Sequence, residues 1–393
     1  MHRRSLLLSG LGATTAAATA LTGAAPAPST DRTEQSRDRK GGGLSAAQHR
    51  QLTLLVQQYL ADRAARVTAA RPAPNQATSL ALTSDLLRDH RSDVDRLDGV
   101  RDQTAALHSG YTRARTTAEL TDVTVHGRTV TARAVEHTAL YFARIAPGTP
   151  ASTRYRSAHH VVFHQNNGTW ALAGCRYLPT NAYSRPLTQF PESIPEPMRP
   201  RVVPNAVPQA GRRPAKADPS GRRPAAKPTD GGYDYSAMVS YAEQWWYDRN
   251  FLSYPVYDDD CTNFISQCLV TGGWLTEGSW PDNPRDDNSC WYCYGFFYNT
   301  SYTWAGAENF FVYATQNSKR TTVLDDAYDL SPSDILQYNF SHAPNDIQHT
   351  QICTGWNESP LMTEHTDDYA DRPLSEILSD PANGSAWLYP LQT

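Results

Sequence analysis

The sequence lacks several features that would place it in a class directly. After its N-terminal stretch it has no run of about 18 apolar residues, so no membrane span is expected once that stretch is removed. The net charge of −4 is small, so nothing global favours nucleic acid or an anionic membrane as a partner. The pair Cys290 and Cys293 forms a C-x-x-C motif without a second such pair, so a zinc site is not expected.

The chain of 393 residues is long enough for two domains of ordinary size, each with its own core. At the N-terminus, Arg3 and Arg4 precede an apolar run rich in Ala, Thr and Gly that ends near Ala27. This order predicts a secretory signal over residues 1–27, and the arginine pair fits the twin-arginine type. Residues 28–43 are polar and are expected to be disordered. We therefore expect a secreted, extracellular protein, with association with the cell wall as one alternative.

Residues 44–178 change from helical to strand periodicity. A helix is predicted within 44–68 and a second, shorter one over 77–92. From about Gly110 the alternation and the β-branched residues are typical of antiparallel strands. A helix followed by a curved antiparallel sheet predicts a small α+β domain, cystatin-like or nuclear-transport-factor-like. The first helix presents one apolar face made of Leu52, Leu55, Val56 and Tyr59.

Three histidines of this first domain, His159, His160 and His164, are candidate metal ligands. His160 and His164 share a strand face with Val162, and no acidic or cysteine ligand is placed nearby. We therefore favour half-exposed histidines of a sheet over a metal site, and we expect neither a metal nor another cofactor.

Residues 179–231 differ sharply in composition from their surroundings. Twelve of the chain's 27 prolines lie there, and the tripeptide Arg-Arg-Pro at 212–214 recurs at 222–224. Such a segment cannot build a core, and it is expected to be an extended, semi-rigid, basic linker. A second role, in which its cations contact anionic cell-wall polymers, stays open.

Residues 232–393 contain eight of the nine tryptophans. The aromatic stretch 274–304 has no clear periodicity, and it forms either a groove wall or a set of rings that covers the core. Helices come first and strands after, which is an α+β order. The predicted helices span about 235–250, 260–270 and 305–317, and the predicted strands span 335–338, 349–354, 361–365 and 387–391.

Cys261 directly follows a signal for the start of a helix. Asp260 is a good N-cap residue, and Gly272 lies where the helix is expected to end. In the first turn of a helix, unpaired N–H groups and the helix dipole stabilise a thiolate. The same N–H groups can bind the oxyanion of an acyl-transfer intermediate. The alternative for Cys261 is a buried, unreactive thiol that only packs in the core. We favour this interpretation for Cys268. The buried stripe of this helix is Ile265, Cys268 and Leu269.

A nucleophilic thiol needs a base, and the good candidates downstream are His349 and His365. If Cys261 must remain a thiolate in an oxidising setting, the other five cysteines cannot all pair within the chain. Cys290 and Cys293 form either a local disulfide or two plain thiols, and the connectivity stays open. The other cysteines are Cys175, Cys268 and Cys353.

Four segments resemble a known family by their content and their order. They are DCTNFISQ at 260–267, SDILQY at 333–338, QHTQICTG at 348–355 and EHTDDY at 364–369. Together they are similar to the putative amidase domain family of secreted Gram-positive bacterial proteins, which is related to papain-like and NlpC-type cysteine hydrolases. The resemblance covers about 232–393 and implies a papain-like (NlpC-type) fold there, so the expected fold class is α+β with the smaller α+β domain in front.

The resemblance also implies roles for individual residues. Cys261 would be the nucleophile, and His349 would act first as base and then as acid. His365, on the next strand, would fix the tautomer of the His349 ring, and Asp367 is the competing residue for that role. One departure is Gln348, since the family tends to have an aspartate directly before this histidine.

The three consecutive aspartates before the cysteine act against a thiolate. Asp258, Asp259 and Asp260 would raise the pKa of the thiol if all three pointed at it. At least two of them should therefore face solvent, a cap site or a substrate ammonium group. A calcium site is not expected, because the Asp-x-Asp-x-Asp-Gly spacing of a calcium loop is absent from the sequence.

The sequence thus predicts a secreted cysteine hydrolase that cleaves amide or peptide bonds through an acyl-enzyme, with cell-wall peptides as the expected substrates. The alternative is a non-enzymatic cell-wall or glycan-binding protein with a degenerate hydrolase domain, whose aromatic loop is a ligand platform.

Overall fold

The helices and strands follow the predicted order of two mixed segments. The computed structural model describes residues 43–70, 80–179, 185–190, 215–219, 232–294 and 299–393. The predicted signal, residues 28–42 and most of the predicted linker lie outside the described residues. The first segment comprises α1 (Ala46–Arg66), α2 (Ser84–Ala106), β1 (Tyr111–His126), β2 (Thr129–Phe142), β3 (Ser152–Asn166) and β4 (Thr169–Leu178).

The second segment begins with helices and ends with strands, as its periodicity predicts. Its helices are α3 (Tyr235–Trp245), α4 (Cys261–Thr271), α5 (Tyr302–Ala305), α6 (Ala307–Val312), α7 (Leu374–Ser379) and α8 (Pro381–Gly384), with the π-helical turn Tyr313–Asn317 and the 3₁₀ turn Ala327–Asp329. Its strands are β5 (Thr322–Val323), β6 (Ile335–Asn339), β7 (His349–Trp356), β8 (Pro360–Glu364), β9 (Tyr369–Pro373) and β10 (Trp387–Gln392).

Helix α1 shows how local sequence sets an element. The Ser45 hydroxyl accepts the N–H of Gln48 at 3.2 Å, and the Gln48 side chain accepts the N–H of Ser45 at 2.9 Å, which is a capping box. The apolar face is buried against the sheet through Leu52, Val56 and Tyr59. The predicted helix over 44–68 is confirmed, whereas α2 is longer than the helix predicted over 77–92.

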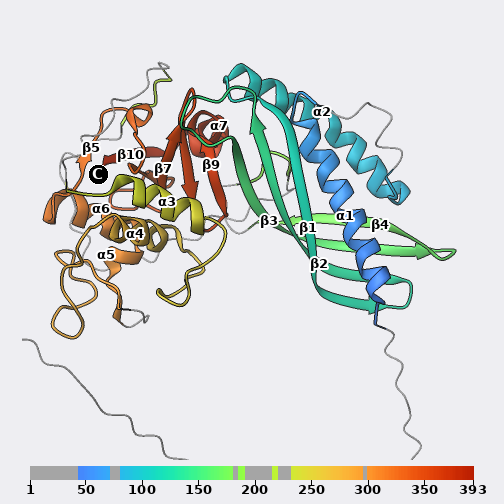
Figure 1. Cartoon of the computed structure of the whole chain (residues 1–393), viewed down its shortest axis with the longest axis horizontal. Coiled ribbons are helices and arrows are strands. Elements are labelled where there is room, and N and C mark those ends of the chain that lie inside the picture. Colours follow the sequence, from blue (N-terminus) through green and yellow to red (C-terminus); the bar gives the residue numbers. More distant parts are fainter. Residues whose placement is uncertain (1–42, 71–79, 180–184, 191–214, 220–231, 295–298) are drawn as a thin grey trace, which may run out of the picture. The chain divides into compact units, whose positions relative to one another are not determined.

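One antiparallel sheet of ten strands joins the two segments (Figure 1). Its order is β1-β2-β3-β9-β8-β7-β6-β10-β5, and β4 pairs with β3. The mixed α/β class is therefore observed. The two segments meet where β3 pairs with β9, with Arg154 opposite Ala370 and Tyr155 opposite Tyr369.

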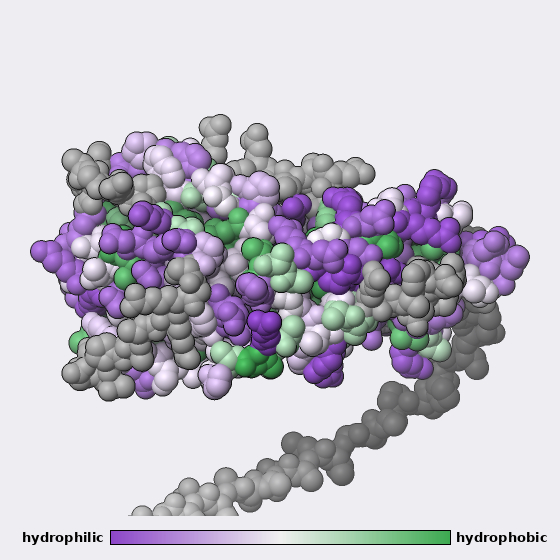
Figure 2. Space-filling view, turned by 90° about the horizontal axis from the view of Figure 1, so that it is seen from above, coloured by the Kyte–Doolittle hydropathy of each residue, from purple (hydrophilic) through white to green (hydrophobic). Residues whose placement is uncertain are grey.

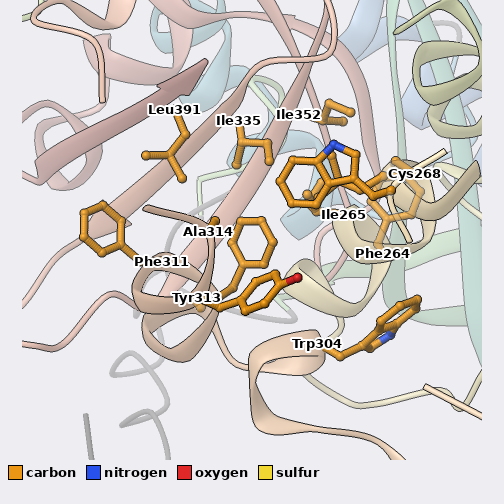
Figure 3. Packing of buried hydrophobic residues seen from close by; sticks show 14 of the residues in the cluster. Phe264, Ile265, Cys268, Trp304, Phe311, Tyr313, Ala314, Ile335, Ile352 and Leu391 are labelled. Carbon is orange, nitrogen blue, oxygen red and sulfur yellow. The ribbon is translucent and has the colours of Figure 1, made fainter. Parts of the chain in front are cut away.

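The second segment buries its aromatic rings around α4. Figure 3 shows Ile265 and Cys268 of this helix near Ile352 of the sheet. Trp274, Trp291 and Trp304 are at most 1 % exposed in the same cluster, so these three rings cover the core rather than line a groove. The helix predicted over 305–317 begins at Ala307, because Gly306 is extended, and its last turn, Tyr313–Asn317, is π-helical.

Two further expectations concern membrane-spanning helices and the state of the cysteines. Among the described helices, none has the length and apolar character needed to cross a membrane. The face seen in Figure 2 is mainly hydrophilic, with hydrophobic side chains in small groups. All six cysteines are free thiols in the structure, so Cys290 and Cys293 are plain thiols rather than a disulfide.

The two segments also share one hydrophobic core at the β3–β9 pairing. Tyr111 and Tyr155 of the first segment pack in one cluster with Leu361 and Tyr369 of the second. The Tyr111 hydroxyl donates to the Glu376 carboxylate, and Arg154 pairs with Asp371 at 2.6 Å. The described residues from Gly43 to Thr393 form one compact unit.

We predict that residues 232–393 expressed alone are much less stable than the same residues in the whole chain. The fragment would expose Leu361 and Tyr369, which are buried here, and would leave the edge of β9 unpaired. Thermal unfolding and gel filtration of fragment and whole chain measure this. A monomeric fragment with an unchanged melting temperature would instead support the two separate domains predicted from the sequence.

Candidate active site

Cys261 is the first residue of α4, as predicted, and it is 3 % exposed. Asp260 occupies the N-cap position, and its carbonyl accepts the N–H of Phe264 at 3.0 Å. Its carboxylate makes no capping hydrogen bond to the first turn. The positive end of the helix therefore faces the region of the thiol without a side-chain cap from Asp260.

The structure brings His349 to Cys261. His349 is the first residue of β7 and is 2 % exposed, and its imidazole lies near the thiol, where it lowers the pKa of Cys261. The neighbouring residues fix this approach, because the hydroxyls of Thr262 and Thr350 are hydrogen-bonded at 2.9 Å. Helix and strand are thus joined beside the two residues that were predicted to pair.

Glu364, at the end of β8, is the residue that contacts the other side of the His349 ring. Its carboxylate is hydrogen-bonded to Nε2 of His349 and also accepts Nε2 of Gln351 at 2.8 Å. The Tyr338 hydroxyl donates in turn to Gln351 at 2.7 Å. Burial by itself lowers the pKa of His349, but the charge of Glu364 and the hydrogen bonds to Cys261 and Glu364 raise it well above the ordinary value.

His365 does not take the place predicted for it beside His349. Its Nδ1 faces the Asp260 carboxylate at 2.7 Å, and its Nε2 faces the carbonyl of Trp245 at 2.6 Å. The ring stacks on Phe264 with 3.8 Å between centroids. His365 therefore holds Asp260, the residue before Cys261, rather than His349.

Strand geometry explains why Glu364 was missed. In the pairing of β7 with β8, Ile352 lies opposite Thr363, so Gln351 faces position 364. Alternation places His349 on the same face as Gln351 and therefore on the face of Glu364. His365 follows on the opposite face. The competing candidate, Asp367, lies near Tyr177 and Tyr369, where, after burial, its charge helps to raise both tyrosine pKa values.

The three aspartates separate as the thiol requires. Asp258 and Asp259 are exposed, whereas Asp260 is 1 % exposed and pairs with Arg249 at 3.4 Å and with His365. The pKa of Cys261 is raised, first by burial and then by the charge of Asp259, while contact with His349 lowers it.

The three strand histidines have different surroundings. His160 and His164 are exposed on β3, but His159 is fully buried and lies 2.8 Å from the Glu136 carboxylate, so a half-exposed position is wrong for His159. Burial opposes the charge of His159, yet Cys175 and Glu136 raise its pKa to about 9. In the part of the chain that the structure describes, no group of three or more His, Cys, Asp or Glu side chains could hold a metal ion.

Comparison with known proteins agrees with the motifs of the second half. Residues 232–389 match the family described as "Putative amidase domain", so the resemblance predicted from the sequence is confirmed there. The description points to a hydrolase of the amidase type. The chain is also 33% identical over 141 residues to the "Uncharacterized protein YhbB" of Bacillus subtilis (strain 168). That match covers 35% of this chain and 42% of that protein, less than half of its length.

One solved structure also resembles part of the chain, the crystal structure of the intermembrane space region of chloroplast protein ARC6. The match has 16% identity and covers 33% of this chain and 95% of that chain. Its TM-score of 0.23 is too low to identify a common fold.

We predict that Asp259→Asn lowers the pKa of the Cys261 thiol. Because the Asp259 charge raises that pKa, its removal increases the thiolate fraction below the midpoint and leaves the alkaline plateau unchanged. The rate of Cys261 alkylation by iodoacetamide, followed by peptide mass spectrometry from pH 6 to 11, measures the midpoint. The side chain is exposed, so we expect a change of only about two- to threefold that shrinks at high salt.

Asp258→Asn is the matched control, since Asp258 is an exposed neighbour that is not among the main causes of the thiol pKa shift. Equal midpoints for the two variants would contradict the electrostatic role of Asp259.

Proposed function

We propose that this chain is a cysteine hydrolase that cleaves amide bonds through an acyl-enzyme. The observation that carries the proposal is the buried series in which Cys261 contacts His349 and His349 contacts Glu364. Thiol, imidazole and carboxylate are the nucleophile, the base and the residue that orients the base in this class of catalysis. The match to an amidase-type family supports the amide bond as the target.

The chemistry follows from the three groups. The Cys261 thiol passes its proton to His349 while its sulfur attacks the carbonyl carbon of the amide. The N–H groups of the first turn of α4 are placed to stabilise the oxyanion that forms. His349 then donates the proton to the amide nitrogen, the C–N bond breaks, and a thioester remains on Cys261. Water, deprotonated by the same ring, releases the acid and restores the thiol.

Glu364 makes His349 a stronger base and stabilises the imidazolium that forms in both steps. The reactive form of the couple carries a single proton shared between sulfur and ring, so the two groups titrate together. Because the pKa values of Cys261 and His349 are both raised, we expect this form to accumulate on the alkaline side of neutrality.

The arrangement of the site supports a papain-like architecture for residues 232–393, because a thiol at a helix N-terminus faces an imidazole on an antiparallel sheet. Cys261 is 3 % exposed, so a substrate carbonyl reaches the sulfur only after neighbouring residues move. We further propose cell-wall peptides as substrates and an extracellular location. The location rests on the predicted signal over residues 1–27, and contact of the basic linker with wall polymers is part of the same proposal.

The alternative of a binding module with a degenerate site is less well supported. It requires that one of the chemical groups be lost or misplaced, and Cys261, His349 and Glu364 are present and in contact. It also relies on an aromatic platform, yet three tryptophans of that stretch lie in the core.

We predict that Cys261→Ala abolishes the release of amines from cell-wall peptides while the melting temperature stays within a few degrees. The nucleophile would be lost, and the cavity left by one sulfur is small. Cys268→Ala is the matched control, because Cys268 lies on the same helix and is fully buried in the core. It should keep full activity at a slightly lower melting temperature. Persistent amine release by Cys261→Ala would refute the cysteine mechanism.

A second pair of variants separates Glu364 from the candidate that the sequence suggested. Glu364→Gln keeps the shape but removes the charge that raises the pKa of His349. We expect turnover to fall roughly a hundredfold or more, with its pH midpoint displaced downward. Asp367→Asn should change turnover by no more than a few fold, and it should leave the pH midpoint close to that of the wild type. Turnover is measured across pH for both variants. A large loss in Asp367→Asn with little change in Glu364→Gln would assign the orienting role to Asp367 instead.

A further inference from the structure

The turn between β8 and β9, residues 365–368, lies between the catalytic helix and the first segment. It follows Glu364 directly, and it leads into the strand that pairs with β3. Thr366 within it has φ +87°, a conformation that β-branched residues rarely adopt. Such a conformation persists only where the surroundings fix it, and the turn is indeed held from both sides.

On one side, the turn holds the backbone just before the nucleophile. His365 contacts the Asp260 carboxylate at 2.7 Å. The Thr366 hydroxyl accepts the N–H of Asp260 and donates to the Asp259 carboxylate, both at 3.3 Å. Three consecutive positions, 364, 365 and 366, thus contact the base or the residues that precede Cys261.

On the other side, the turn is held by Arg156 of β3. The Arg156 N–H donates to the carbonyl of Asp368 at 3.0 Å, and its guanidinium meets the Asp368 carboxylate at 3.2 Å. The second oxygen of Asp368 pairs with Arg249 at 2.8 Å, and Arg249 reaches Asp260 at 3.4 Å. A series of alternating charges therefore runs from the first segment to the residue before Cys261.

Burial along this series shows why it affects the site. The Arg156 side chain is 39% exposed, Asp368 is 10% exposed, and Asp260 is 1% exposed. A carboxylate buried this deeply needs its cations, because an unpaired charge in the interior is strongly disfavoured. If Arg156 is lost, Asp368 attracts the Arg249 guanidinium more strongly. Arg249 then moves away from Asp260, and the ion pair between Arg249 and Asp260 is weakened.

We propose that Arg156 is a positioning residue of the amidase site, supplied by a part of the chain outside the family-matched residues 232–389. Through Asp368 it holds the Arg249 guanidinium against Asp260, and through the turn it sets the place of Glu364. The proposal rests on the cysteine hydrolase function proposed above, and it makes the first segment part of the working enzyme.

The test compares Arg156→Ala with Arg133→Ala in the full chain. Arg133 is an exposed arginine of the neighbouring strand β2 and serves as the matched control. The readout is alkylation of Cys261 by iodoacetamide across pH, resolved by peptide mass spectrometry. For Arg156→Ala we expect a rate about threefold lower near neutral pH and a midpoint displaced upward. Arg156→Lys should restore both, and Arg133→Ala should match the wild type.

A second comparison tests the route through Arg249. In an Arg249→Gln background, Arg156→Ala should have little further effect, because the series is already interrupted. An unchanged midpoint in Arg156→Ala, or a full effect of Arg156→Ala in that background, overturns the inference. If amine release requires Cys261 while Arg156→Ala behaves like Arg133→Ala, the positioning role alone falls. If Cys261→Ala still releases amines, the hydrolase mechanism falls and the inference falls with it.

Discussion

The contact between His349 and Glu364 in a water-excluded interior is the interaction on which the site depends. Each group is at most 2 % exposed, so neither charge is stabilised by solvent. A buried carboxylate and a buried imidazole are tolerated together because each offsets the desolvation of the other. The same pairing raises the pKa of the imidazole, which the proposed transfer of a proton from the thiol requires. Both the stability of the fold and the proposed chemistry therefore require His349 and Glu364 to stay in contact. The hydrogen bonds of Gln351 and Tyr338 hold them in place.

The sequence predicted the site as far as local patterns reach. Cys261 was found from its place after a helix-start signal and within DCTNFISQ, and the amidase-type family was recognised from that string and three later segments. His349 was placed by its order in the chain. Glu364 was missed because its role depends on strand register, and a shift of one residue moves a side chain to the other face. His365, its neighbour, was predicted in its stead.

The fold shows a similar division between local and non-local information. The capping box at Ser45 and the apolar spacing of α1 set that helix within two residues of its predicted ends. The β3–β9 pairing has no counterpart in local periodicity, because only two residue pairs join strands more than 200 positions apart. Cores also combine residues of both segments, such as Tyr155 and Tyr369. The mixed helix and strand content was predicted from the sequence. The continuity of the sheet through both segments was not, because it depends on tertiary contacts.

The shared sheet changes what the connection between the two segments has to do. Thr188 of that connection lies on the first segment, where its carbonyl accepts Arg63 at 2.6 Å, and Lys216 bridges to Asp326 of the second. Thr188 and Lys216 therefore contact two segments that are already hydrogen-bonded to each other through β3 and β9. The covalent link then mainly raises the effective concentration of one segment near the other, so that strand pairing is an intramolecular event. Its exact length matters little for affinity, because closure entropy grows only with the logarithm of length. Insertions and deletions in this connection should accordingly be tolerated far better than changes at the β3–β9 seam.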